Sequence, residues 1–148
     1  MKQAGILAGA AALVAALLPA AALAQGAVSI DSAVFVERVQ PGNVRSLEPA
    51  SRLDRGDRVV TIVTWRRAAG SGGFVVTNPL PRAIAYQGSA SGNEQVSVDG
   101  GRTWGKLGEL RIGSRTATPE DVTHMRWRVP AASAARGQGR IAYSGIVR

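Results

Sequence analysis

The sequence contains no cysteine, one histidine and few aromatic residues, which make up 5% of its 148 positions. Without cysteine the chain cannot be a miniprotein held by disulfides, and a core of buried apolar side chains must stabilise it instead. The single histidine, His124, excludes a metal site built on two histidines. No Gly-rich phosphate loop leads from a strand into a helix, so we expect no cofactor.

Long apolar runs are also absent after residue 24, where no stretch reaches the roughly 20 residues that a membrane-spanning helix needs. The first 24 residues combine Lys2, an apolar run, Pro19 and an Ala-Leu-Ala end, as in a cleaved secretory signal peptide. An uncleaved anchor is the alternative, but the run holds few Leu or Ile. We expect one exported domain at 25–148, periplasmic or extracellular, with no transmembrane segment after cleavage.

Positive charge is in excess, with 18 Lys and Arg against 10 Asp and Glu and a formal net charge of +8. A basic exported protein can meet anionic lipids or acidic polysaccharides. No block of five or more cations occurs, so a nucleic-acid partner is not expected. For the same reason we favour a general enrichment of the sequence in Arg, Ala and Gly as the explanation of the excess.

Alternating and β-branched segments predict strands along the whole exported part. Residues 58–68 are almost continuously β-branched and predict a central strand ending near Trp65. In 121–129 the alternation places Val122, His124, Arg126 and Arg128 on one face, opposite Met125, Trp127 and Val129. About eight strands are expected, at 28–39, 58–68, two within 74–91, 94–98, 102–110, 121–129 and 140–148. Residues 40–57, 69–73 and 131–139 are expected to be loops, and the pattern favours an antiparallel β-sandwich.

Five segments in this order carry a family resemblance: RGDRVVTIVTW, VVTNPLPRAIAY, SVDGGRTW, DVTHMRWRVP and GRIAYSGIVR. Over about residues 54–148 the chain resembles the conserved repeat domain of bacterial surface proteins, known as domain of unknown function 11. The resemblance implies an immunoglobulin-like sandwich of about 7–9 strands that acts as a spacer or stalk and carries no catalytic residues. The chain departs from the family pattern at Arg67 to Gly73 and at Asn78, and it holds one copy where family members often hold several.

The string SVDGGRTW at 97–104 resembles the Asp-box of sialidase propellers. In that motif the residue types suit turn chemistry, so we expect a structural hairpin made by Ser97, Asp99, Gly101, Thr103 and Trp104. A sialidase also needs an arginine cluster, a tyrosine with an acid partner and several blades, for which the chain is too short. A hydrolase or glycosidase is therefore the less favoured alternative to a non-enzyme. A Ca²⁺ ion at Asp99 stays open.

Arginines beside two tryptophans give the one candidate binding surface. If the strands that carry Trp65 and Trp127 are neighbours, then Arg66, Arg67, Arg126 and Arg128 form a patch that grips phosphate or carboxylate. The alternative is that these arginines are solvated and keep the sheet edges unpaired. We expect a non-enzymatic, envelope-associated structural or protein-interaction module. A module that binds an anionic envelope polymer or lipid is the alternative.

Overall fold

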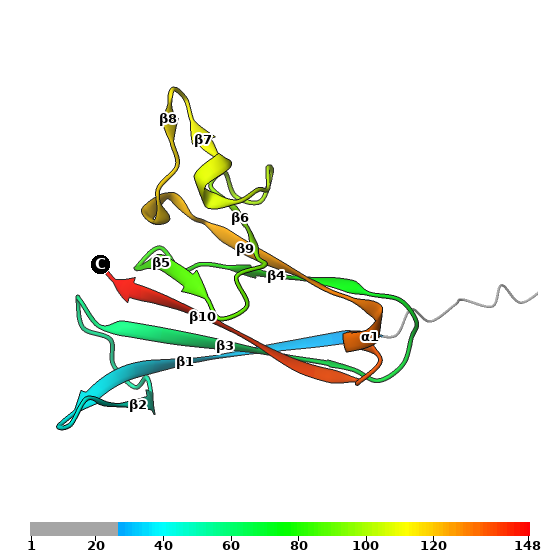
Figure 1. The fold of residues 1–148 in the computed structure, drawn as a ribbon, viewed down its shortest axis with the longest axis horizontal. Coiled ribbons are helices and arrows are strands. Elements are labelled where there is room, and N and C mark those ends of the chain that lie inside the picture. The colour runs from blue at the N-terminus through cyan, green and yellow to red at the C-terminus, as the bar shows by residue number, and fades with distance from the viewer. Residues whose placement is uncertain (1–26) are drawn as a thin grey trace, which may run out of the picture.

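Two antiparallel sheets pack face to face in the computed structural model, which describes residues 27–148 (Figure 1). The predicted signal peptide lies outside the described residues. The larger sheet has the strand order β2-β1-β3-β10-β5 and the smaller sheet the order β4-β9-β6. The larger sheet contains β1 (Val28–Gln40), β2 (Val44–Pro49), β3 (Arg58–Arg67), β5 (Ile84–Ser89) and β10 (Gln138–Val147). The smaller sheet contains β4 (Phe74–Pro79), β6 (Gln95–Ser97) and β9 (His124–Val129). The expected antiparallel β-sandwich is therefore confirmed.

A separate arm leaves the smaller sheet after β6. It holds a 3-10 turn, η1 (Leu107–Glu109), and a two-stranded ladder of β7 (Arg111–Ile112) and β8 (Arg115–Thr116). A second 3-10 turn, η2 (Pro119–Asp121), leads into β9, and a short helix, α1 (Ala131–Ala134), joins β9 to β10. Figure 1 shows the arm projecting from the sandwich on one side and α1 closing one end of it.

The core forms because alternate side chains of each strand face the opposite sheet. On β3 the buried side chains are Val59, Thr61, Val63 and Trp65, in strict alternation with more exposed neighbours. Aromatic rings join the two layers at two places. Trp127 of β9 stacks on Tyr143 of β10 at 5.9 Å between centroids, and Trp65 meets Phe74 of β4 edge to face at 5.1 Å.

Seven of the eight predicted strands are present, with ends that shift by a few residues. The strand predicted at 102–110 is wrong, because only Gly105 bridges to β6 and a 3-10 turn follows. The loop predicted at 40–57 contains β2, which pairs with β1 through a turn at 41–43. The loop at 131–139 contains α1. Val122 was predicted to share a strand face with His124, Arg126 and Arg128, but it is buried, because it precedes β9 and does not follow the alternation of that strand.

The order of strands within the sandwich differs from that of an immunoglobulin constant domain. Without β2, β7 and β8, the larger sheet joins the first, second, seventh and fourth strands, and the smaller sheet joins the third, sixth and fifth. An immunoglobulin constant domain places its fifth strand in the first sheet and its seventh in the second. Here the fifth of these strands, β6, lies in the smaller sheet, and the seventh, β10, lies in the larger sheet. As a result β10 is central in the larger sheet, between β3 and β5.

Candidate functional site

The hairpin after β6 is held by the side chain of Asp99. Its Oδ1 accepts hydrogen bonds from the backbone N–H groups of Arg102 (3.1 Å) and Thr103 (2.9 Å) and from Ser97 Oγ (2.8 Å). Its Oδ2 accepts one from Thr103 Oγ1 at 2.7 Å. The bonds from the Thr103 backbone, the Thr103 hydroxyl and Ser97 hold the pKa of Asp99 well below its usual range. Oδ1 thus accepts three hydrogen bonds and Oδ2 one, and residues 27–148 contain no group of three or more His, Cys, Asp or Glu side chains that could hold a metal ion.

Ser97 and Trp104 complete this hairpin. Ser97 is fully buried, and its Oγ accepts the N–H of Gly101 at 2.8 Å. Gly101 has a φ of +90°, a conformation that glycine adopts at no steric cost. The indole N–H of Trp104 donates to the carbonyl of Gly101 at 2.9 Å. These contacts are the ones expected of a structural fastener, and they use the predicted hairpin residues for turn geometry.

The four arginines predicted to form one patch lie on two different sheets. Arg66 and Arg67 end β3 in the larger sheet, whereas Arg126 and Arg128 belong to β9 in the smaller sheet. The expected neighbour relation between these strands is wrong, since β3 pairs with β1 and β10 and β9 pairs with β4 and β6. The structure therefore forms no single patch from the four.

Arg67 has a structural role in its own loop. Its guanidinium donates to the backbone carbonyls of Ala69 (3.2 Å), Ser71 (2.6 Å) and Gly72 (2.7 Å), and it also lies 5.7 Å from the centre of the Phe74 ring. Each of its three nitrogens thus has a carbonyl partner in the turn between β3 and β4. Arg67 is engaged in this turn and is not a free anion receptor.

Arg126 and Arg128 line a groove of about 400 Å³, here called the β9 groove, together with Lys106. The guanidinium of Arg126 lies 4.6 Å from the centre of the Trp104 ring, and its Nε donates to Gln95 Oε1 at 2.9 Å. These two contacts fix the plane of the guanidinium. Within residues 27–148 its two terminal nitrogens make no hydrogen bond, so they remain available to a carboxylate or phosphate.

One carboxylate, that of Glu94, also lines the β9 groove. Its Oε1 accepts a short hydrogen bond from the hydroxyl of Tyr86, and its Oε2 accepts one from Ser89 Oγ at 2.5 Å. Partial burial raises the pKa of Glu94, but the bonds from Ser89 and Tyr86 outweigh it and lower the pKa overall. Glu94 forms no ion pair with the three cations, so the groove keeps a positive balance.

Cations that have acidic partners lie elsewhere in the sandwich. Of the six ion pairs within residues 27–148, five join residues between positions 37 and 58, and the sixth joins Arg115 to Asp121. Cations that no acid in the described chain pairs line the region from η1 along β9 to α1 and the start of β10: Lys106, Arg126, Arg128, Arg136 and Arg140, with Arg66 beside Arg140 on the larger sheet.

One further hollow adjoins the β9 groove, and a second adjoins that hollow in turn. A cleft of about 270 Å³ beside α1, here called the α1 cleft, is lined by Arg128, Arg136 and Arg140 and by both Trp65 and Trp127. A shallower hollow of about 280 Å³ on the larger sheet is lined by Arg66 and Arg140. Arg136, Arg140 and Lys106 were not predicted as site residues, because only the fold brings them near β9.

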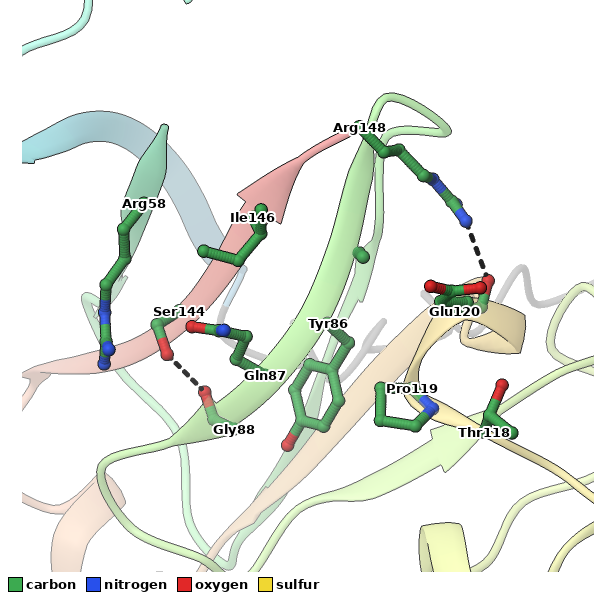
Figure 2. A pocket seen from close by; sticks show the side chains of 11 residues that line it. Arg58, Tyr86, Gln87, Gly88, Thr118, Pro119, Glu120, Ser144, Ile146 and Arg148 are labelled. Carbon is green, nitrogen blue, oxygen red and sulfur yellow. Dashed lines mark hydrogen bonds between the residues drawn. The ribbon is translucent and has the colours of Figure 1, made fainter. Parts of the chain in front are cut away.

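A larger groove, of about 1050 Å³, lies over β5 and β10 beside η2 (Figure 2). Its two arginines are already engaged. Arg148 donates to the backbone carbonyls of Arg82 (2.7 Å) and Glu120 (3.1 Å), and Arg58 pairs with Glu37 at 2.6 Å. Since these charges have partners within the molecule, this groove is a poorer anion site than the smaller β9 groove.

Comparison with known proteins finds no family model that matches the chain, no similar curated protein and no similar solved structure. The resemblance to the conserved repeat domain of surface proteins therefore stays a prediction. In the part of the chain that the structure describes, no helix is long and apolar enough to cross a membrane.

Proposed function

We propose that this protein is a non-enzymatic binding module of the cell envelope that recognises an anionic ligand, carrying carboxylate or phosphate groups, in the β9 groove. The observation that carries the proposal is the fixed guanidinium of Arg126, held by Trp104 and Gln95 beside Arg128 and Lys106. The envelope location rests on the signal peptide predicted at residues 1–24.

The geometry of Arg126 favours recognition of an oxyanion. A guanidinium with one face on an aromatic ring and its Nε bonded keeps two parallel N–H groups for a bidentate contact. Because the side chain is already ordered, less rotamer entropy is lost when a ligand binds. Arg128, two residues along the strand, projects from the same face of β9 and adds a second charge.

Three features support a role in binding over one in catalysis. Asp99 accepts four hydrogen bonds from Ser97, Arg102 and Thr103 of its own hairpin. Tyr86 is buried, and burial, followed by its contact with Glu94, raises its pKa above the usual range, so the phenol stays protonated. The His124 ring lies against Trp104, and its Nδ1 contacts Thr123 Oγ1 at 3.1 Å. Each group with a candidate catalytic role is thus engaged in structural contacts.

The test is calorimetric titration of the full exported chain with three probes. These are a short oligogalacturonate as a carboxylated saccharide, phosphatidylglycerol vesicles as a phosphate surface, and maltotetraose as a neutral saccharide. We expect binding to at least one anionic probe, none to maltotetraose, and weaker binding as salt rises. Arg126→Gln should lower the affinity about tenfold, the scale of a lost charge-assisted hydrogen bond.

Arg55→Gln is the matched control, because Arg55 is an exposed arginine in the turn before β3, outside the β9 groove. An equal loss of affinity in Arg55→Gln and Arg126→Gln would show diffuse charge attraction and overturn the β9 groove as the site. Absence of binding to both anionic probes would overturn anion recognition altogether. The structural or protein-interaction role predicted from the sequence would then be the better account.

A further inference from the structure

We infer that the ligand of the β9 groove is an extended carboxylated polysaccharide, and that its chain continues from this groove into the α1 cleft. This inference rests on the proposed function and adds the length and class of the ligand. The two hollows share Asn93 and Arg128 in their linings, so they adjoin each other. Together they form a furrow, here called the basic furrow.

The basic furrow carries five cations, none of which has an acidic partner within residues 27–148. Lys106 and Arg126 line its first part, Arg128 lies where the two parts meet, and Arg136 and Arg140 line its second part. Figure 1 shows that the end of β9, the helix α1 and the start of β10 meet at one end of the sandwich, and these elements bring Arg128, Arg136 and Arg140 together. A single small anion would contact only part of this row, whereas a linear polyanion would contact all of it.

The α1 cleft has the size and polarity to hold one sugar ring. Its volume of about 270 Å³ lies just below the range typical of drug-sized ligand sites. Hydroxyl and amide groups of Ser91, Asn93 and Ser133 line it beside the arginines. Trp127 also lines the cleft, and its buried indole N–H has no acceptor within the described residues.

The aromatic residues of the basic furrow favour a saccharide over a single-stranded nucleic acid. Non-specific binding of single strands needs open aromatic faces on which bases stack. Trp65 and Trp127 are only 4% and 2% exposed. Arg126 covers one face of the Trp104 ring, and His124 meets that ring edge to face. Sugar hydroxyls and carboxylates, in contrast, need the side-chain amides, hydroxyls and guanidiniums that the furrow offers.

The third hollow, which Arg66 lines, contributes less to binding of the ligand chain. It shares Gln138, Gly139 and Arg140 with the α1 cleft, but it lies on the outer face of the larger sheet. On this sheet Asp31 of β1 lies opposite Thr64 of β3, and Thr64 lies opposite Arg140 of β10. The carboxylate of Asp31 weakens the positive field there, so we place the end of the path at Arg140.

The experiment compares oligogalacturonates of two, four and eight residues, titrated into the full exported chain. A ligand held at both ends gains effective concentration at the second contact. We expect the octamer to bind more than about tenfold tighter than the dimer. Arg126→Gln should weaken the dimer and the octamer alike, because both occupy the β9 groove. The double variant Arg136→Gln/Arg140→Gln should instead remove most of the gain of the octamer over the dimer. Both arginines are exposed, so the substitutions remove no buried contact.

The double variant Arg55→Gln/Arg82→Gln controls for the loss of two charges away from the furrow, and it should keep the full length dependence. If the octamer still binds more tightly than the dimer in Arg136→Gln/Arg140→Gln, the gain in affinity would come from the larger number of ways in which a longer chain can place a short stretch in the β9 groove. That result would overturn the extended path while the proposed function stands. Failure of every oligogalacturonate to bind overturns both. Tighter binding of a single-stranded oligonucleotide, lost in Arg136→Gln/Arg140→Gln, would overturn the saccharide assignment.

Discussion

The guanidinium carbon of Arg126 lies over the indole ring of Trp104, 4.6 Å from the ring centre. This contact links the hairpin motif to the β9 groove. The bonds of Asp99 and Ser97 shape the turn, the turn carbonyl of Gly101 fixes the indole, and the indole fixes the arginine. The motif thus has a structural role that also serves the proposed binding site.

Ser97→Ala should destabilise the fold by about 1–3 kcal/mol, the usual cost of leaving a buried donor without its partner. The variant removes the acceptor of the Gly101 N–H and one donor to Asp99 at a fully buried position. Urea unfolding gives the measurement. Ser114→Ala is the control, because this serine is exposed in the turn between β7 and β8, and it should change stability by less than about 0.5 kcal/mol. Equal stability of both variants would contradict the hairpin role.

Stability should fall in acid partly because Asp99 is bonded as a carboxylate. Hydrogen bonds from Thr103 and Ser97 lower its pKa below the unfolded value of about 3.9. A carboxyl group whose pKa is lowered by folding stabilises the fold at pH values above the pKa of the unfolded state. This contribution declines progressively as the pH falls from about 5 to 2. The stability gap between the wild type and Asp99→Asn should therefore narrow over that range. Urea midpoints at pH 6, 4 and 2.5 measure it, with Asp31→Asn as the control for a lost charge. A constant gap would show that Asp99 ionisation does not stabilise the fold.

The sequence allowed the strands of the sandwich to be predicted where periodicity was strong. The alternation along β9 separated its two faces, because side chains of a strand alternate strictly between them. The almost continuous β-branched run of β3 predicted a central strand, and β3 lies between β1 and β10. Turn chemistry identified the hairpin at 97–104 for a similar reason, since the hydrogen bonds of the Asp99 carboxylate and of the Trp104 indole are local. The strand β2 escaped prediction because its exposed edge position needs no apolar alternation.

The candidate site could be predicted only in part. Arg126 and Arg128 share one strand face, which local pattern can show, but their neighbours depend on which strands pair. Arg66 and Arg67 resemble them in sequence and lie on the other sheet. Lys106 and Arg136 approach β9 through connections whose paths no short motif encodes. The basic furrow is therefore a product of topology, in particular of the central place of β10.

Gly139→Ala should destabilise the protein by about 1–3 kcal/mol, the usual cost of overpacking a core. A Cβ at this position would lie 2.4 Å from the Trp65 ring, which crosses the β10 backbone there. Gly108→Ala is the matched control, because nothing lies within 4 Å of the Cβ it would add and its φ is not positive. Thermal unfolding of both variants gives the comparison. A stable Gly139→Ala variant would mean that Trp65 does not pack closely against β10.

Arg67→Gln should loosen the turn between β3 and β4 without weakening anion binding. The substitution removes three hydrogen bonds to carbonyls of the turn. Hydrogen exchange of amides 69–73 should become faster, because local opening follows from the loss of local contacts. Arg66→Gln removes the same charge from the neighbouring position and should leave this exchange unchanged. Weaker binding of oligogalacturonate by Arg67→Gln, together with unchanged hydrogen exchange of amides 69–73, would mean that Arg67 contributes to the binding surface.

Trp104→Leu tests whether the indole orders Arg126 for binding, because it changes no charge in the β9 groove. Cation–π contacts at exposed sites are worth about 0.5–1 kcal/mol, so oligogalacturonate affinity should fall about two- to fivefold. In the double variant with Arg126→Gln the Trp104→Leu substitution should have little further effect, because the arginine it orders is gone. Trp104→Phe keeps an aromatic face but loses the bond to Gly101, and it separates ring stacking from hairpin support. Additive losses in the double variant would mean that Trp104 acts on the hairpin alone, and that the order of Arg126 comes from Gln95.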